Sequence, residues 1–262
     1  MIQHQFKKKF GQNFLTDKNL LNAICEDAEV DESQDVLEIG AGAGALTQAI
    51  SEKAKKVVSY EIDKDLESHL LGLNLDNVKF VFGDIMNFSL EEIEKDFQGE
   101  YKLIANLPYY ITTPIIFKFL NQSKKISSLT IMVQKEVAER IVAGVGGKEY
   151  GVLSIMTQFY GDAKINRTVS RKMFHPQPNV DSAVVTIKLN REKYKNVDSD
   201  KFYNFIKSAF SMRRKTLRNN LTHSGFNKAQ IDVLGEEILS KRAENFDIEG
   251  LLKIYLQIFD VF

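Results

Sequence analysis

The sequence Asn106-Leu107-Pro108-Tyr109 ends an apolar strand pattern, and its residue types can bind and orient an aromatic amine. The side-chain carbonyl of Asn106 and the backbone carbonyl of Leu107 can each accept one amine hydrogen. Pro108 fixes the backbone and adds no competing N–H group, and Tyr109 can stack on a base. Methyl transfer to such an amine needs little proton abstraction before attack, so positioning and electrostatics are enough. The motif predicts N-methylation without a general base or a metal; the alternative is a rigid polar turn.

A glycine-rich turn follows an earlier strand pattern and opens a helix pattern, within residues 38–44 (EIGAGAG). Its glycines, Gly40 and Gly42 among them, let the backbone turn sharply and approach a ligand closely. The spacing differs from the G-x-G-x-x-G of dinucleotide-binding folds. A nucleoside that carries an amino acid, S-adenosylmethionine (SAM), therefore fits better than NAD. Taken alone, the turn could be only a tight strand-to-helix connection.

Two acidic residues stand where the next two strand patterns end. Glu61 lies 21 positions after Gly40, where a carboxylate can accept hydrogen bonds from both ribose hydroxyls, and Asp84 can accept one from an adenine amino group. The carboxyl ends of neighbouring parallel strands meet at one edge of a sheet, which is where such folds bind ligands. Together with the glycine turn, these residues predict a SAM site.

The elements that position these residues alternate between strand and helix. Apolar strand patterns read VLEI, KVVSYEID, VKFVFGD, KLIANLP and SLTIMVQ, with helical patterns such as 64–73 and 114–121 between them. This alternation predicts right-handed βαβ units and a mostly parallel α/β sheet. Two further strands are expected at 163–169 and 182–189.

Beyond residue 190 only helical patterns remain, which places a domain boundary there. We expect a catalytic domain at 1–190 and a helical domain at 191–262. One apolar stripe in the helical part consists of Phe202, Phe205, Ile206, Ala209 and Phe210.

Composition excludes several classes of protein. The chain has 262 residues, of which 44% are hydrophobic and 27% are charged. Its single cysteine, Cys25, rules out a disulfide framework and a cysteine-based zinc site, and we expect it to be a core residue. No apolar run approaches the ~18 residues of a membrane span, and no apolar segment follows the basic N-terminus, as a secretory signal would require. We expect a cytoplasmic protein without membrane contact.

The net charge of zero hides an asymmetry. Residues 19–100 contain 6 basic and 19 acidic side chains. Because the whole chain has no net charge, the remaining residues have an equal excess of basic over acidic side chains. Such a division is typical of proteins that bind a polyanion on one face. The alternative is a solvated surface on which the charges mix in three dimensions.

Several motifs follow one another along the chain. In order, they are FGQNFL (10–15), EIGAGAGALT (38–47), Glu61, Asp84, NLPY (106–109), QKEVAER (134–140), FHPQPNVDSA (174–183) and RRKT (213–216). In these motifs the chain resembles the ribosomal RNA adenine N6,N6-dimethyltransferases, especially the bacterial small-subunit group, over essentially its whole length. The resemblance implies a Rossmann-like SAM-dependent methyltransferase domain with a mostly parallel seven-stranded sheet, and a small all-helical C-terminal domain. It also implies transfer of two methyl groups to each of two adjacent adenosines in the 3′-terminal loop of 16S rRNA. The expected partner is an immature small ribosomal subunit, with a role in ribosome biogenesis, and we expect a monomer.

The resemblance also assigns roles to residues. The positions that match the family's SAM contacts are Asn13, Leu15, Gly40, Glu61, Asp84 and Asn106. Gln12, their neighbour, and Gly42 of the glycine turn are further cofactor-binding candidates. Tyr109 and Phe174 correspond to the aromatic residues that sandwich the flipped adenine, although Phe174 beside its proline turn could also be a core residue. The chain departs from the family at Ala41, where proline is common, and at His175 inside the F-x-P-x-P turn; neither departure removes a proposed contact.

Two basic segments are candidates for RNA binding. Lys7, Lys8 and Lys9 form an N-terminal arm that could order on RNA or could be a disordered tail. The second set, Lys207, Arg213, Arg214, Lys215 and Arg218, has no acidic residue among it. That favours phosphate binding over a solvated helix face.

Three other functions remain open at this point. The related 23S rRNA adenine methyltransferases that confer macrolide resistance would share the pocket, and a ribosome-assembly factor with a silent site would share the fold. A DNA adenine methyltransferase is a weaker alternative. The segments QKEVAERIVAG and RRKT favour the small-subunit group.

Overall fold

The structure is a computed structural model that describes residues 14–108 and 111–259. Its chain divides into two compact units, the sheet unit (Met1–Ala138 and Ala163–Leu189) and the helical unit (Glu139–Asp162 and Asn190–Phe262). The domains expected at 1–190 and 191–262 remain a prediction, and the compact units differ from them because residues 139–162 belong to the helical unit. None of the helices in the described part of the chain combines the length and the apolar composition of a membrane span.

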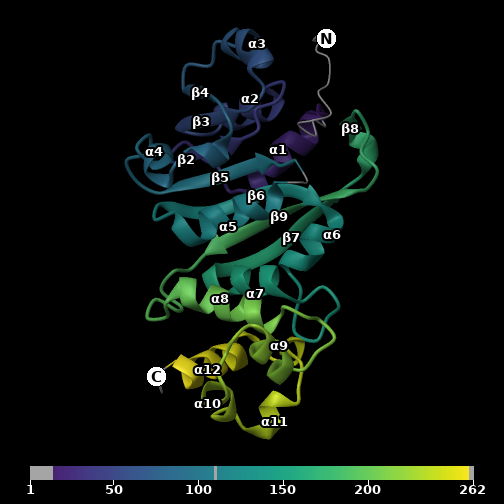
Figure 1. Cartoon of the computed structure of the whole chain (residues 1–262). Coiled ribbons are helices and arrows are strands. Elements are labelled where there is room, and N and C mark those ends of the chain that lie inside the picture. Colours follow the sequence, from purple (N-terminus) through teal and green to yellow (C-terminus); the bar gives the residue numbers. More distant parts are fainter. Residues whose placement is uncertain (1–13, 109–110, 260–262) are drawn as a thin grey trace. The chain divides into compact units, whose positions relative to one another are not determined.

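The sheet unit is built on seven strands in the order β4-β3-β2-β5-β6-β9-β7 (Figure 1). Their bounds are β2 (Asp35–Ile39), β3 (Lys56–Glu61), β4 (Val78–Phe82), β5 (Tyr101–Asn106), β6 (Ile126–Gln134), β7 (Gly161–Val169) and β9 (Ser182–Leu189). Strands β2 to β6 pair in parallel, whereas β9 pairs antiparallel to β6. The predicted mostly parallel, seven-stranded sheet is therefore confirmed. A separate two-stranded ribbon pairs β1 (Phe14–Leu15) with β8 (Phe174–His175).

Helices connect these strands as the alternating pattern predicted. They are α1 (Lys18–Asp27), α2 (Ala45–Ser51), α3 (Glu67–Leu71), α4 (Leu90–Glu94), α5 (Thr112–Gln122) and α6 (Lys135–Ile141), with 3₁₀ turns η2 (Lys64–Leu66), η3 (Ile85–Asn87) and η4 (Arg171–Met173). Asp17 caps α1 by accepting a hydrogen bond from the Leu20 N–H at 2.8 Å. The segment expected as one helix at 64–73 is instead η2 followed by α3.

The core lies on both faces of the sheet, which explains why its strands read as continuous apolar runs. Every residue of β2 is buried, and Phe119 of α5 is fully buried. Cys25 is also fully buried with a free thiol, as expected of a core residue. Each large apolar side chain buried in this way stabilises the fold by roughly 1.5–3 kcal/mol.

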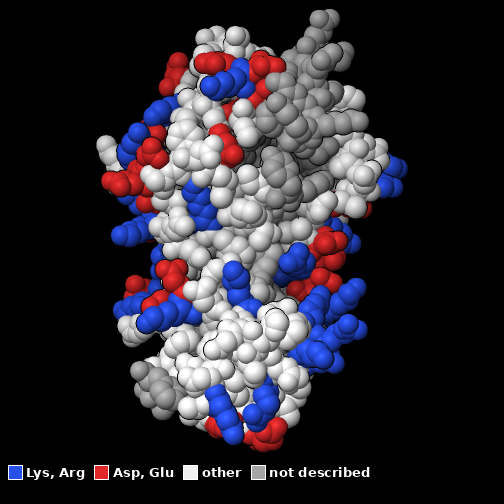
Figure 2. All heavy atoms as spheres, viewed as in Figure 1, with Lys and Arg blue, Asp and Glu red and all other residues white. Residues whose placement is uncertain are grey.

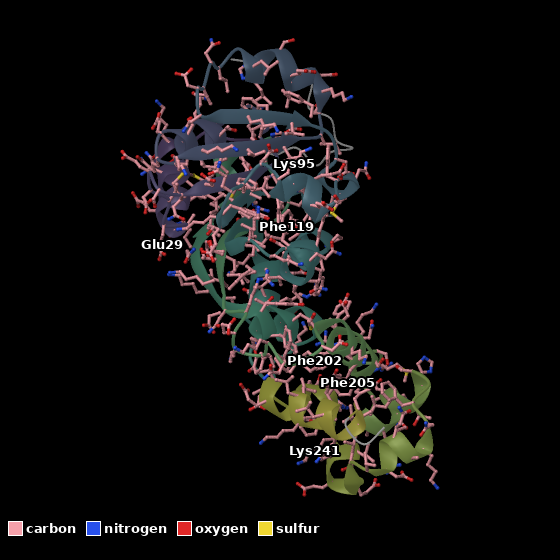
Figure 3. The ribbon with its side chains drawn as sticks, turned by 90° about the vertical axis from the view of Figure 1, so that its left-hand side faces the viewer. Glu29, Lys95, Phe119, Phe202, Phe205 and Lys241 are labelled. Carbon is pink, nitrogen blue, oxygen red and sulfur yellow. The ribbon has the colours of Figure 1, made fainter. Side chains whose placement is uncertain are left out.

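The helical unit contains α7 (Val152–Tyr160), α8 (Ser199–Ala209), α9 (Leu217–His223), α10 (Lys228–Asp232), α11 (Gly235–Leu239), η5 (Ala243–Asn245) and α12 (Ile248–Phe259). The predicted stripe forms its core: Phe202 and Phe205, labelled in Figure 3, are buried, and Phe202 lies 5.4 Å from the ring of Tyr255 on α12. Phe159 of α7 stacks on Phe202 at 5.0 Å. This contact explains why residues 139–162 belong to the helical unit.

Candidate active site

Glu61 fastens the glycine turn to the end of β3. Its carboxylate accepts one hydrogen bond from the Gly42 N–H at 2.7 Å and another from the Asp63 N–H at 2.8 Å. Only 4% of Glu61 is exposed. Burial raises the pKa of Glu61, and the two backbone donors act in the opposite direction. Because a carboxylate has about four acceptor positions, these bonds leave capacity for a ligand's hydroxyl groups.

The glycine turn passes close to the ends of two strands. Gly40 has φ +85° and Gly42 has φ +55°, a left-handed backbone that favours glycine. The Gly40 N–H donates to the carbonyl of Tyr60 at 2.8 Å, and a Cβ added at Gly40 would lie 3.5 Å from the carbonyl oxygen of Asn106. A side chain here would fill space beside the Asn106-Leu107-Pro108 motif.

A pocket at this turn brings four of the predicted site residues together. Its lining is Phe14, Leu15, Leu21, Gly40, Gly42, Ala43, Ala45, Leu46, Asn106 and Met132. Leu15, Gly40, Gly42 and Asn106 were all predicted from the sequence. Glycines and alanines line one part of the pocket, apolar side chains such as Phe14 and Met132 line another, and Asn106 adds a polar group. This mixture suits the amino-acid-bearing nucleoside that the spacing predicted, and Glu61, which bonds to Gly42, is not itself among the lining residues.

Asp84 follows the end of β4, whose last residue, Phe82, pairs with Glu61 on β3. Its Oδ1 accepts a hydrogen bond from the Met86 N–H at 2.9 Å and so caps η3. The preceding Gly83 N–H donates to the carbonyl of Glu61 at 2.8 Å. The first bond closes the turn on itself, and the second ties it to the end of β3.

The backbone is held on both sides of the Leu107 carbonyl. The Leu107 N–H donates to the carbonyl of Met132 at 3.2 Å. The carbonyl of Pro108 accepts from the Ile111 N–H at 3.2 Å and from Thr112 Oγ1 at 3.1 Å. Helix α5 begins at Thr112, shortly after the motif, and bonds back to it at Pro108.

Some predicted residues fall outside the described part of the chain. These are Lys7, Lys8, Lys9, Gln12, Asn13 and Tyr109. Their roles stay predictions.

Phe174 lies in the two-stranded ribbon, where it pairs with Leu15. Only 6% of Phe174 is exposed, and its ring belongs to a buried cluster with Leu15, Leu21 and Met132. In this arrangement it has the environment of a core residue. Its contact with a flipped base stays a prediction.

Glu38 is a buried acid below the glycine turn that the sequence analysis did not single out. Its Oε2 accepts hydrogen bonds from Thr47 Oγ1 and Ser59 Oγ, each at 2.6 Å, while Oε1 has no partner among the described residues. Burial raises the pKa of Glu38 to about 7. An acid inside the apolar run VLEI was the available signal.

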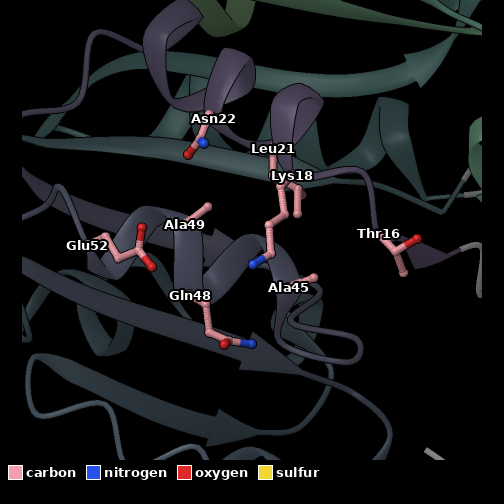
Figure 4. Close-up of a pocket in the computed structure, with 8 residues that line it drawn as sticks. All are labelled: Thr16, Lys18, Leu21, Asn22, Ala45, Gln48, Ala49 and Glu52. Carbon is pink, nitrogen blue, oxygen red and sulfur yellow. The ribbon is translucent and has the colours of Figure 1, made fainter. Parts of the chain in front are cut away.

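A second cavity lies between α1 and α2 (Figure 4). Its lining is Thr16, Lys18, Leu21, Asn22, Ala45, Gln48, Ala49 and Glu52. It shares Leu21 and Ala45 with the pocket at the glycine turn, but none of these eight residues was a predicted site residue.

The predicted RNA-binding residues of the helical unit differ in their surroundings. Lys207, Arg214 and Lys215 are exposed. Arg213 is exposed as well and donates to the backbone carbonyl of Lys148.

Arg218 is half-buried and forms ion pairs with Asp232, at 3.4 Å, and with Glu236. On the face shown in Figure 2, basic and acidic side chains accordingly both occur on the helical unit.

The sheet topology, the glycine turn bonded to an acid at the next strand end, and Asn106 in the same pocket define a Rossmann-like SAM-dependent methyltransferase. A family model described as ribosomal RNA adenine dimethylase matches residues 3–257. The chain belongs to this family, which confirms the predicted enzyme class.

Individual relatives agree with this assignment. The chain is 41% identical over 267 residues to the ribosomal RNA small subunit methyltransferase A of Fusobacterium nucleatum subsp. nucleatum, covering 99% of both chains. It is 42% identical to the protein of that name from Clostridioides difficile, covering 94% of this chain and 88% of the relative. A dimethyladenosine transferase from Plasmodium falciparum has a similar crystal structure, with a TM-score of 0.81 and 28% identity over 94% of this chain and 98% of that one.

Proposed function

We propose that this protein transfers methyl groups from SAM to the N6 amines of two adjacent adenosines in the 3′-terminal loop of 16S rRNA. Its substrate is the RNA within an immature small ribosomal subunit, and the reaction is a step of ribosome biogenesis in the cytoplasm. The protein acts as a monomer. The observation that carries this proposal is that Asn106 lines the same pocket as Gly40 and Gly42. The name of the relatives, a small subunit methyltransferase, supports the choice of RNA.

The cofactor is held by Gln12, Asn13, Leu15, Gly40, Gly42, Glu61, Asp84 and Asn106. When bound, SAM supplies an electrophilic methyl group on a sulfonium. The remaining acceptor positions of Glu61 would receive the ribose hydroxyls, and those of Asp84, whose Oδ1 caps η3, would accept from the adenine amine.

The target amine is aimed by two acceptors, the Asn106 side-chain oxygen and the Leu107 carbonyl. Hydrogen bonds on either side of Leu107, to Met132 and from Thr112, keep that carbonyl in place. Two acceptors on one nitrogen favour a tetrahedral amine whose lone pair points away from them, toward the methyl donor. The proton leaves to water after transfer, so no side chain acts as a general base.

The adenosine must leave its stack to reach this pocket. Tyr109 and Phe174 offset part of the cost, since one base–aromatic stack contributes roughly 1–3 kcal/mol. Lys7, Lys8, Lys9, Lys207, Arg213, Arg214, Lys215 and Arg218 contact phosphates. Such contacts position the RNA without reading its sequence.

Labelled SAM and two substrates test the proposal: small and large ribosomal subunits from cells that lack both modifications. We expect dimethyladenosine in the 3′-terminal loop of the small-subunit RNA, and no label with Asn106→Ala. Label only in the large subunit would assign the protein to the resistance enzymes. SAM binding without label in either subunit would favour a silent assembly factor.

A further inference from the structure

Helix α5 carries one lysine toward the turn that follows Asp84. The Lys118 ammonium donates hydrogen bonds to the carbonyls of Ile85, at 2.9 Å, Met86, at 3.4 Å, and Phe88. These carbonyls belong to η3 and the residue next to it, which is the turn that Asp84 caps from its N–H side. The turn is thus held through its N–H groups by Asp84 and through its carbonyls by Lys118.

These bonds are of the stronger kind. An ammonium has three donors, and hydrogen bonds from a charged group are roughly twice as strong as neutral ones. Lys118 is partly buried, and that burial lowers its pKa, while the nearby charge of Asp84 acts in the opposite direction. Burying a lysine ammonium costs free energy unless its N–H groups donate hydrogen bonds, as those of Lys118 do.

The beginning of α5 is fixed as well. Thr112, the first residue of the helix, bonds to the carbonyl of Pro108 in the amine-binding motif. Along the same helix, Ile115, Ile116 and Phe119 are buried in the core. One helix of 11 residues therefore contacts both the motif at the end of β5 and the turn at the end of β4.

We propose that Lys118 is a positioning residue that holds the Asp84 carboxylate where it accepts the amino group of the cofactor's adenine. Lys118 acts through Asp84 and does not itself touch the cofactor. This inference rests on the proposed function, because it assumes the role given there to Asp84. It adds a residue that selects adenosine over nucleosides without that amino group.

The test compares two ligands of the full-length protein by calorimetry. S-adenosylhomocysteine has the amino group, and S-inosylhomocysteine has an oxygen in its place, which a carboxylate repels. We expect the wild type to prefer the adenosyl ligand by about tenfold or more, the value of a hydrogen bond to a charged group. Lys118→Met should lose most of this preference by weakening the adenosyl ligand alone, and Lys118→Arg should restore part of it.

Lys125→Met is the matched control. Lys125 Nζ also donates to two backbone carbonyls, of Glu94 at 3.1 Å and Phe97 at 2.6 Å, but just before β6 begins. The amino end of β6 lies at the opposite edge of the parallel sheet from the strand ends that carry Glu61 and Asp84. This variant loses the same kind of contact and should keep the wild-type preference.

The outcomes distinguish the positioning role of Lys118 from the assignment of Asp84 as the acceptor of the adenine amino group. An undiminished preference in folded Lys118→Met, or an equal loss in Lys125→Met, would overturn the positioning role. Equal binding of both ligands by the wild type would instead overturn the assignment of Asp84. If Lys118→Met does not fold, Lys118→Gln decides the question, because its neutral amide should retain only part of the preference. A full preference in that variant would overturn the role.

Discussion

The polar side chains at the strand ends of the sheet unit and the predicted RNA-binding residues of the helical unit differ in burial and in their contacts. At the strand ends, the contacts are buried and directional: Glu61 is 4% exposed and bonds to backbone N–H groups of Gly42 and Asp63. On the helical unit, Arg214 and Lys215 are exposed, and Arg218 is engaged by acids of its own unit.

This difference predicts a division of labour. Buried contacts are strong and geometrically strict, so the strand ends should decide which ligand binds and whether it reacts. Exposed charges are screened by salt over about 10 Å at 0.1 M, so the helical surface should set affinity for RNA and its salt dependence. Variants of the two regions should therefore change different measurements.

Of the variants that compare these two regions, Tyr109→Ala should have the largest effect. Loss of one base–aromatic stack should reduce methyl transfer by roughly 10- to 100-fold. The affinity for SAM should stay nearly unchanged, because the glycine turn and Glu61 remain. Steady-state methylation and equilibrium SAM binding, measured on the same preparation, check this. A large loss of SAM binding would contradict the stacking role.

Glu61→Ala should have the next largest effect, and it should change only the affinity for the cofactor. It removes the acceptor of the Gly42 and Asp63 N–H groups as well as the acceptor for the ribose, so we expect SAM to bind about tenfold more weakly. Glu61→Gln keeps one side-chain oxygen and should lose less. Calorimetry with SAM measures both variants, and RNA binding should not change. A parallel loss of RNA binding would break the distinction between the two regions.

Much of this arrangement could be predicted because its signals are local. Strands such as β9 (Ser182–Leu189) were predicted with the correct bounds, since apolar runs between turn residues mark a sheet covered on both faces. The neighbourhood of Gly42 and Glu61 followed from βαβ geometry.

Other features depend on tertiary contacts that leave no local pattern. Strands β1 and β8 have two residues each and join segments about 160 positions apart, too short for a period to be visible. The ion pairs of Arg218 with Asp232 and Glu236 connect different helices, so the sequence around Arg218 shows a cation without its partners. Lys118 is a single lysine in an apolar helix, and only the fold shows that it contacts the Asp84 turn.

A smaller effect is expected from Arg213→Ala combined with Arg214→Ala. Removal of two phosphate contacts should lower the affinity for small-subunit RNA several-fold and reduce the slope of log K against log salt by about 1.5. Arg242→Ala is the matched control, because Arg242 is paired with Glu244 and is not among the predicted RNA-binding residues, so its loss should leave the slope unchanged. An unchanged slope in the double variant would remove this segment from the RNA interface.

The smallest effect on methyl transfer is expected from Glu38→Gln, which should instead change how stability depends on pH. The pKa of Glu38 is raised from 4.5 to about 7. At a pH between these two values, the folded protein therefore keeps a proton on Glu38 that the unfolded chain has released. The stability that Glu38 contributes is therefore fully present below pH 4.5 and is lost as the pH rises toward 7. The amide introduced by Glu38→Gln does not titrate, yet its oxygen can still accept from Thr47 and Ser59.

Urea unfolding at a series of pH values measures this difference. The Glu38→Gln variant should lose less stability across the window than the wild type, by on the order of 1–3 kcal/mol. Glu32→Gln makes the same change in net charge at an exposed position and should follow the wild type. The alternative outcome is an equal loss of stability with rising pH in the wild type, Glu38→Gln and Glu32→Gln. In that case the Glu38 carboxyl of the folded protein is not protonated, and the sheet unit contains a buried charge that its contacts do not predict.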